Sequence, residues 1–224
     1  MDSERFVRQR ALFGPGEQER LRGTTVVIVG CGGLGSQLIA DLVSAGMAHF
    51  VLVDGDTVEP SNLNRQFIHF GNLGMRKVDS AGRWIKTADP GAEVTGYARM
   101  LDADNASEIV SSGDIVADCT DNVGTRRILA EACRRAGRTL VHAGVEGRYG
   151  QVMTFLPDAP VTLGEIVGKK DVPDHISYAP AVSLVGAVQA DELIMTVLGR
   201  SEPGTLITVD LENRSMERRS FPIR

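Results

Sequence analysis

The densest group of side chains that could do chemistry lies in residues 53–66, which read VDGDTVEPSNLNRQ. This stretch follows a glycine-rich loop at the distance at which nucleotide-binding proteins hold a ribose and its phosphates. Its carboxylates, amides and guanidinium predict nucleotide contacts from Asp54, Asp56, Ser61, Asn62, Asn64, Arg65 and Gln66. Such a set suits phosphate chemistry better than hydride transfer.

The glycine-rich loop fits G-x-G-x-x-G with Gly30, Gly32 and Gly35. Between a predicted strand and a predicted helix, this motif presents backbone N–H groups and a helix N-terminus to a phosphate. The motif alone also fits a tight turn that lets a helix pack closely on a strand. Asp54 comes 24 residues after Gly30 and can accept hydrogen bonds from ribose hydroxyls, so the two features together favour a nucleotide, either NAD or ATP.

Two cations favour ATP over NAD. Arg65 offers a fixed fork of donors to phosphate oxygens, and Lys77, at the start of the next predicted helix, adds a compact second charge. Taken alone, Lys77 would be interpreted as a solvated surface lysine. Beside Arg65 we predict that it binds phosphate.

A second polar group, DCTDN at residues 118–122, follows the fourth predicted strand, where open α/β sheets place ligands. Asp118 is expected to point into the sheet interior or to cap the turn. Asp121 and Asn122 are predicted nucleotide-site residues, and Asp121 could hold Mg²⁺ through its oxygens. The alternative, compatible with the first, is that Asp121 caps the helix beginning near Thr125.

Composition excludes several classes of protein. The 224 residues carry a formal net charge of −5, which argues against nucleic acid and anionic membranes as partners. We see no leader and no apolar run of the roughly 18 residues that a membrane span needs, so we expect a cytoplasmic protein.

The three cysteines, Cys31, Cys119 and Cys133, predict neither a disulfide framework nor a zinc site and are expected to be buried. The histidines have no metal-like spacing and are expected to be structural or surface residues.

Alternating β-branched and amphipathic stretches predict an α/β, Rossmann-like fold, with a mostly parallel sheet flanked by helices and a C-terminal antiparallel strand pair. The predicted strands are residues 25–29, 50–53, 93–100, 115–119, 139–145, 151–156, 205–211 and 216–221. The predicted helices begin near Leu34 and Lys77 and cover about 105–111, 125–136 and 181–198, the last being a buried central helix too polar to span a membrane. We expect one domain, residues 1–224, with a long loop at about 157–178. Phe6, Leu12 and Phe13 predict that the arginine-rich N-terminus docks.

Five motifs together resemble the ThiF/MoeB/HesA family, the bacterial branch of ubiquitin-activating-like adenylyltransferases. In chain order they are RFVRQ from Arg5, GCGGLGS from Gly30, DGDTVEPSNLNRQ from Asp54, KV at Lys77 and DCTDN from Asp118. The similarity runs from about residue 4 to residue 156 and resumes near Ala179.

The resemblance implies ATP- and Mg²⁺-dependent adenylation of the C-terminal glycine carboxylate of a ubiquitin-like sulfur-carrier protein ending in Gly-Gly, by a homodimer. It implies that Gly33 touches the nucleotide, Asp54 the ribose, and Asn64, Arg65 and Lys77 the phosphates. It also implies that Asp121 holds Mg²⁺ and that Arg8 reaches the ATP of the neighbouring subunit, which makes Arg65, Lys77, Asp121 and Arg8 the catalytic set.

Two features depart from many members of this family. The paired Cys-x-x-Cys zinc ligands are absent, and residues 157–224 contain no cysteine. We therefore predict no zinc and no enzyme-bound thioester, with the adenylate released or passed to a separate sulfurtransferase. The alternatives are adenylation of a small-molecule, peptide or nucleoside carboxylate, an NAD-dependent oxidoreductase, and a non-catalytic partner subunit.

Overall fold

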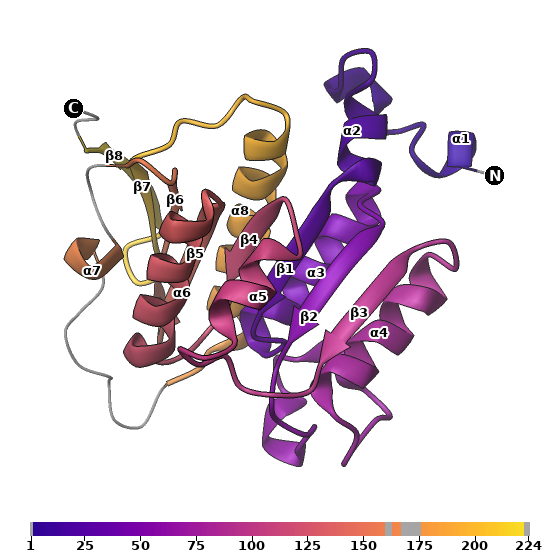
Figure 1. Cartoon of the computed structure of the whole chain (residues 1–224), viewed down its shortest axis with the longest axis horizontal. Coiled ribbons are helices and arrows are strands. Elements are labelled where there is room, and N and C mark those ends of the chain that lie inside the picture. The colour runs from indigo at the N-terminus through magenta and orange to yellow at the C-terminus, as the bar shows by residue number, and fades with distance from the viewer. Residues whose placement is uncertain (1, 160–162, 167–175, 222–224) are drawn as a thin grey trace.

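A single eight-stranded sheet forms the centre of the molecule, with strand order β3-β2-β1-β4-β5-β6-β7-β8 (Figure 1). The computed structural model describes residues 2–159, 163–166 and 176–221. The strands are β1 (Thr25–Val29), β2 (His49–Val53), β3 (Glu93–Tyr97), β4 (Ile115–Asp118), β5 (Thr139–Glu146), β6 (Tyr149–Phe155), β7 (Thr205–Asp210) and β8 (Ser215–Ser220).

Helices flank the sheet on both faces. They are α1 (Asp2–Arg5), α2 (Glu17–Gly23), α3 (Gly33–Ala45), α4 (Lys77–Ala88), α5 (Ala106–Ser111), α6 (Val123–Ala136), α7 (Leu163–Ile166) and α8 (Ala179–Val197), with short 3-10 turns η1 (Arg10–Leu12), η2 (Pro60–Asn62) and η3 (Phe67–His69). The strands from β3 to β5 pair in parallel, and β6, β7 and β8 continue the sheet in antiparallel pairs. The predicted Rossmann-like class is confirmed, although its antiparallel region contains a further strand, β6, beside the predicted pair.

Strand β1 shows why the sheet is buried on both faces. Val26 and Ile28 belong to the core under α3, α4 and α8, whereas Val27 and Val29 belong to the core under α5 and α6. Because side chains alternate along a strand, a continuous apolar run can fill two cores at once.

Most element boundaries lie within a few residues of those predicted. Helix α3 ends before Gly46 and α6 before Gly137, and both glycines adopt the left-handed conformation that ends helices. Strand β3 stops at Tyr97 rather than Met100, because the Arg99 N–H donates to the Tyr97 carbonyl and turns the chain. The predicted loop at 157–178 contains the short helix α7, and some of its residues lie outside the described ranges.

Helix α8 has the length and the apolar composition of a membrane-crossing helix, properties that buried core helices share. It packs against α3, β5 and β6, and half of its apolar 18-residue stretch is buried inside the molecule. Leu193 is fully buried and Asp191 is exposed. These contacts are those of the predicted central helix.

The N-terminal segment docks at the end of α3, as predicted, but not through every residue expected to hold it. Phe6 is buried, and the Arg5 guanidinium donates to the carbonyls of Val43 and Ala88 at 3.0 Å each. Leu12 is 71% exposed, so its predicted docking role is wrong. The segment therefore lies at the ends of α3 and α4, with α1 and α2 in the upper right of Figure 1.

Candidate active site

A cavity of about 460 Å³ opens where β1, β2 and β4 end. Its wall contains the predicted site residues Gly30, Gly32, Gly33, Asp54, Asp56, Asn62, Arg65, Gln66, Lys77, Asp121 and Asn122. The wall also contains Arg99, Met100, Leu101, Arg126, Val145, Ser177 and Val182, among others. Residues far apart in sequence thus meet at the carboxyl edge of the parallel strands, where open α/β sheets bind ligands.

The glycine turn after β1 is shaped by close packing. Gly30 has φ +97°, and a Cβ there would lie 2.5 Å from the Cys119 carbonyl oxygen. A Cβ on Gly35 would overlap the Gly30 carbonyl. The turn therefore brings α3 directly against β1 and leaves the first N–H groups of α3 at the cavity, where an anion could bind them.

Asp54 links this turn to the stretch after β2. Its Oδ2 accepts from the Cys31 N–H and its Oδ1 from the Asp56 N–H, each at 2.8 Å. The residue is 9% exposed and lines the cavity. A carboxylate has about four acceptor sites, so Asp54 can still accept from ribose hydroxyls while it holds both backbones.

Lys77 is a buried cation, not the solvated surface lysine of the alternative interpretation. Its side chain is 8% exposed, and its Nζ lies 2.8 Å from Asp56 Oδ2. The Asp56 side chain is 50% exposed. A phosphate in the cavity would therefore meet a lysine that already has a carboxylate partner, and the two anions would share one ammonium group.

Arg65 is oriented by its own loop. Its Nη1 donates to the Ser61 carbonyl at 3.0 Å and to Asn64 Oδ1 at 2.8 Å. Ser61 and Asn64 are themselves exposed and do not line the cavity. In this structure they orient Arg65 and do not contact the cavity themselves. Their direct nucleotide contacts stay predictions.

Gln66 carries an unsatisfied acceptor beside the glycine turn. The side chain is buried, and its Oε1 has no hydrogen-bond partner among the described residues. A buried amide oxygen without a donor is costly. Because Gln66 lines the cavity, a ligand hydroxyl or amine is the natural donor, which fits a nucleotide.

The loop after β4 separates the roles of its two acids. Asp118 is fully buried, and its Oδ1 accepts from the backbone and hydroxyl of Thr120 at 2.9 and 2.7 Å, so it caps the turn as expected. Asn122 caps α6 by accepting from the Thr125 N–H at 2.8 Å. The alternative that Asp121 is this cap is therefore wrong, because the cap falls one residue later.

Asp121 is exposed and lines the cavity, as a ligand to a phosphate-bound cation would. Among the residues that the structure describes, no group of three or more His, Cys, Asp or Glu side chains could hold a metal by itself. Mg²⁺ is often held by one or two carboxylates together with substrate phosphates. The single carboxylate of Asp121 fits that mode of binding.

The three cysteines are buried, as predicted. Burial and the nearby Asp118 carboxylate raise the pKa of Cys133 to about 12. Burial, together with the Asp54 carboxylate, also raises the pKa of Cys31 well above its usual value, and burial together with Asp118 raises that of Cys119. A thiol that stays protonated is a poor nucleophile.

Arg126 was not named in the sequence analysis, and His142 was expected there only to be a structural or surface residue. Arg126 in α6 lines the cavity and donates from Nη2 to the Thr120 carbonyl at 2.6 Å. His142 in β5 is fully buried, and its Nδ1 lies 2.7 Å from Asp118 Oδ2. The available signal for His142 was a polar residue among the apolar residues Leu140, Val141 and Ala143, because buried polar groups need partners.

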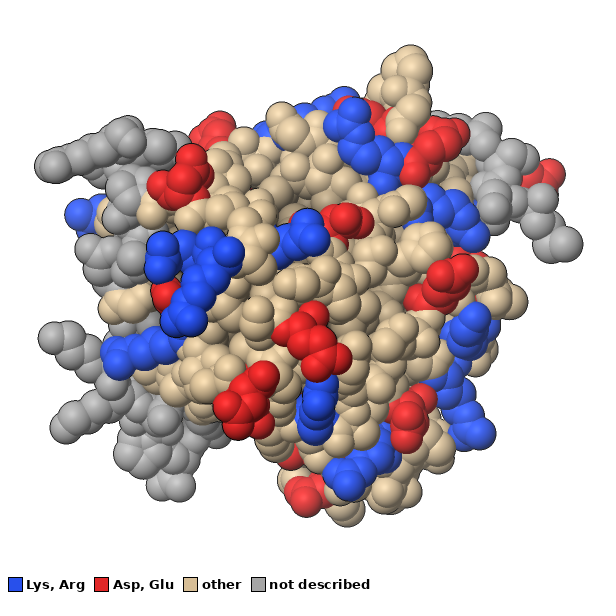
Figure 2. Space-filling model, in the orientation of Figure 1, with Lys and Arg blue, Asp and Glu red and all other residues tan. Residues whose placement is uncertain are grey.

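On the face that Figure 2 shows, acidic and basic side chains are interspersed, so surface charge on this face does not mark a site. The specific charges are those inside the cavity, where Arg65, Lys77 and Arg126 stand near Asp54 and Asp121. The fold and this cavity define a Rossmann-like nucleotide-binding protein.

The chain belongs to the ThiF family, whose model matches residues 6–224. It is 35% identical to the SAMP-activating enzyme E1 of Haloferax volcanii, over 91% of this chain and 79% of that enzyme. It is also 35% identical to the adenylyltransferase and sulfurtransferase MOCS3 of Mus musculus, over 92% of this chain. The chain spans less than half the length of that enzyme and of the other MOCS3 and UBA4 relatives it matches.

Solved structures agree on the fold. The structure of Escherichia coli MccB with AMPCPP and MccA superimposes with a TM-score of 0.87 at 20% identity, over 99% of this chain and 72% of MccB. The structure of PaaA superimposes with a TM-score of 0.82 at 23% identity. The family and its sequence relatives place this chain in the class of ATP-dependent adenylyltransferases.

Proposed function

We propose that the chain adenylates the C-terminal glycine carboxylate of a ubiquitin-like sulfur-carrier protein, using ATP and Mg²⁺ and releasing pyrophosphate. The observation that carries this proposal is one cavity that combines a glycine turn, Asp54, Arg65, Lys77 and Asp121. The names of the Haloferax and mouse relatives support an activating adenylyltransferase.

The side chains that line the cavity are of the types that this reaction requires. A C-terminal carboxylate is already ionised near neutral pH, so it can attack the α-phosphorus without a general base. A carboxylate oxygen bonds to the α-phosphorus, and the bond to the bridging oxygen breaks as pyrophosphate leaves with the electron pair. Arg65 and Lys77 would offset the charge that builds up on the phosphates. Mg²⁺ on Asp121 would supply further neutralisation of the triphosphate.

We infer that the chain forms no thioester with the carrier. Residues 157–224 contain no cysteine, and Cys31, Cys119 and Cys133 are buried with raised pKa values. The adenylate would leave the enzyme or pass to a separate sulfurtransferase. The enzyme would act as a homodimer in which Arg8 serves the neighbouring site.

The direct test is the exchange of labelled pyrophosphate into ATP in the presence of candidate carriers ending in Gly-Gly. We expect carrier-dependent exchange, reduced about 10²–10³-fold in Arg65→Ala, the loss typical for a preorganised charge on the transition state. Asp121→Ala should reduce carrier-dependent exchange to a similar extent. Arg83→Ala and Asp191→Ala remove exposed charges outside the cavity wall and should leave exchange unchanged.

Three outcomes would contradict the proposal. If none of the carriers in the panel supports exchange, this result counts against a protein substrate. If amino acids or peptides drive exchange instead, the substrate is one of the alternative carboxylates. Tight binding of NAD(H) without binding of ATP would favour the oxidoreductase. Equilibrium dialysis with each nucleotide decides the last point.

A further inference from the structure

A buried chain of polar contacts runs from the middle of the sheet to the cavity wall. Asp118 lies at the end of β4 and pairs in register with His142 on the neighbouring strand β5. Both side chains are fully buried. Because a carboxylate only accepts hydrogen bonds, the hydrogen between His142 Nδ1 and Asp118 Oδ2 belongs to the histidine.

The other ring nitrogen of His142 is engaged as well. His142 Nε2 lies 3.2 Å from Gln151 Nε2, an amide supplied by β6. The histidine ring is therefore fixed from both sides and cannot rotate away from Asp118 without breaking a buried contact and a partly buried one. Such contacts lock the orientation of the group they hold.

Asp118 in turn fixes the residues that reach the cavity. Its Oδ1 binds the backbone and hydroxyl of Thr120, and its Oδ2 lies 3.9 Å from Arg126 Nε. Arg126 Nη2 donates to the Thr120 carbonyl, so the arginine and the loop hold each other. The Arg126 side chain is 13% exposed and lines the cavity.

The place of Arg126 along the sheet suggests which substrate it faces. Asp54 follows β2, whereas Thr120 and Arg126 follow β4, and β1 separates these strands. Two strand spacings amount to about 10 Å. With the ribose at Asp54, the phosphates and their Mg²⁺ would extend toward Asp121, and Arg126 on the same side of the cavity would face the acyl carboxylate that attacks the α-phosphate.

We propose that His142 is a positioning residue for adenylation: through Asp118 it holds Thr120 and Arg126 where the acyl carboxylate enters the cavity. This inference rests on the proposed function, because it assigns a role within the same reaction. Arg126 would bind the anionic substrate, and His142 would touch no reacting atom.

The test compares two conservative variants of His142. In His142→Asn the side-chain amide can replace Nδ1 as donor to Asp118, whereas in His142→Gln the amide reaches toward Gln151 instead. We expect His142→Gln to raise the KM for a Gly-Gly-ending carrier about tenfold, the usual size of a lost orienting contact. In His142→Asn the KM should stay close to the wild-type value.

Measuring the Kd for ATP beside the KM for the carrier distinguishes a positioning role from a general loss of structure. The Kd for ATP, measured without Mg²⁺ so that Asp121 does not contribute, should change less than about twofold in both variants, because Asp54, the ribose ligand, lies two strand spacings from β4. Arg126→Gln, on the cavity wall, should show the same rise in KM with little change in ATP binding. The double variant His142→Gln/Arg126→Gln should have the same KM for the carrier as Arg126→Gln alone. Thermal unfolding shows whether each variant is folded.

Several results would overturn this inference. One is carrier kinetics in His142→Gln equal to wild type. Others are equal losses in both His142 variants, or a parallel loss of ATP binding, since these indicate a structural role only. If His142→Gln does not fold, an Arg126→Gln enzyme with unchanged KM is sufficient to reject it. Absence of exchange by the wild-type chain would reject the proposed function and this inference together.

Discussion

Lys77 is a buried cation that is paired with a carboxylate of its own chain. The sequence predicted a phosphate ligand, and the structure shows the ammonium group buried against Asp56. Leaving such a buried ammonium unpaired would be expensive. Asp56 therefore has a role of its own, which is to neutralise Lys77 in the cavity wall.

Glu192 in α8 is a second buried charge, with a weaker set of partners. Its Oε1 accepts from the Thr154 hydroxyl at 2.8 Å, and burial raises the pKa of the carboxyl group. A carboxyl group whose pKa is raised by folding stabilises the fold when protonated. That contribution is present at acid pH and is lost as the pH rises through the pKa of the folded protein.

We predict that Glu192→Gln stabilises the protein at neutral and alkaline pH, by about 1 kcal/mol. The amide keeps the acceptor for Thr154 but carries no charge. At about pH 4, where the wild-type group is largely protonated, the two proteins should be equally stable. Urea unfolding at several pH values measures the difference.

Glu202→Gln is the matched control for this substitution. Glu202 is 65% exposed and pairs with Arg218, and exposed pairs contribute little. Its removal should change the free energy of unfolding only slightly at any pH. A Glu192→Gln protein less stable than wild type at neutral pH would show that the charged form has better partners than those seen here.

At the scale of elements, the glycine turn and α3 act as one unit. Gly35 lies in the first turn of α3 against the Gly30 carbonyl, and Val182 of α8 covers the same turn near Gly33. Larger side chains at these glycines would push the helix N-terminus away from the cavity. Nucleotide binding therefore depends on contacts between backbones rather than on side-chain chemistry alone.

Gly35→Ala should weaken ATP binding more than about tenfold, because its Cβ overlaps a backbone carbonyl and the turn must open. Gly82→Ala, inside α4, is the control. Its Cβ would make an ordinary contact with Val94 at 3.5 Å, and the substitution should stabilise the helix by about 0.5–1 kcal/mol. Calorimetric titration with ATP and thermal unfolding measure the two effects. Unchanged ATP affinity in Gly35→Ala would contradict the assigned role of the turn.

The elements were predictable from local signals, whereas some residues of the site were not. The glycines after α3 and α6 and the apolar periods predicted helix ends and strands, because these signals lie within a few residues. The spacing in sequence correctly placed at the cavity the residues Asp54, Asp56, Asn62, Arg65, Gln66 and Lys77. Arg126 was missed, and His142 was expected only to be a structural or surface residue, because their contacts with Thr120 and Asp118 join separate elements, which no short motif encodes.

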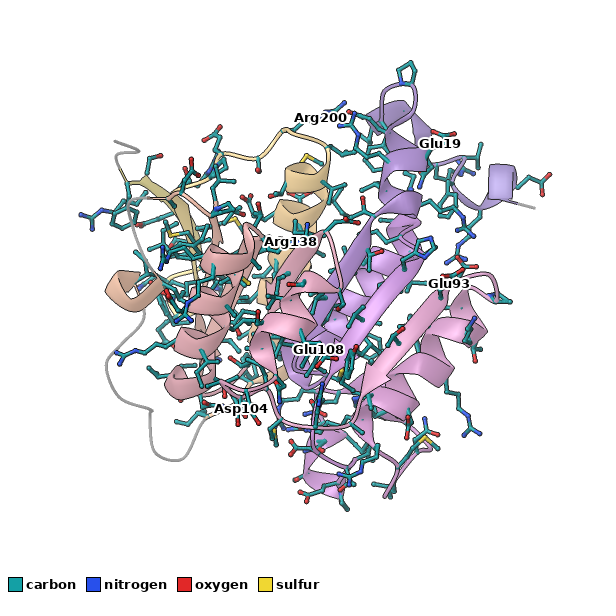
Figure 3. All side chains as sticks on the ribbon, viewed as in Figure 1. Glu19, Glu93, Asp104, Glu108, Arg138 and Arg200 are labelled. Carbon is teal, nitrogen blue, oxygen red and sulfur yellow. The ribbon has the colours of Figure 1, made fainter. Side chains whose placement is uncertain are left out.

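For the whole molecule, the position of Arg8 matters most. Gln9 donates to the Ala45 carbonyl at the end of α3, and α3 begins at the cavity with Gly33. A helix of this length spans about 20 Å, so exposed Arg8 lies roughly one helix length from its own cavity. The segment after α8 joins this region, where Arg200 points toward α2 (Figure 3) and pairs with Glu17 at 2.7 Å.

This distance makes the proposed action of Arg8 across a dimer testable by mixing variants. Arg8→Ala and Asp121→Ala should each be inactive alone. A mixed dimer would have one intact site, so random exchange of subunits should restore about a quarter of the activity. Pyrophosphate exchange before and after mixing measures the recovery.

The control mixes Arg65→Ala with Asp121→Ala chains. Both residues belong to the same cavity, so every site in a mixed dimer lacks one of them and activity should stay low. If the Arg8→Ala and Asp121→Ala mixture behaves like this control, Arg8 does not act in the neighbouring site.

The cavity also constrains when the protein can first bind its nucleotide during synthesis. Its wall begins with Val29 and ends with Val182, the residue of α8 that covers the glycine turn. A ribosome releases the N-terminal residues first, so a nascent chain presents its glycine turn and Asp54 well before α8 emerges. ATP stabilises only chains whose site is complete, and the growing chain must therefore reach α8 without help from its own ligand.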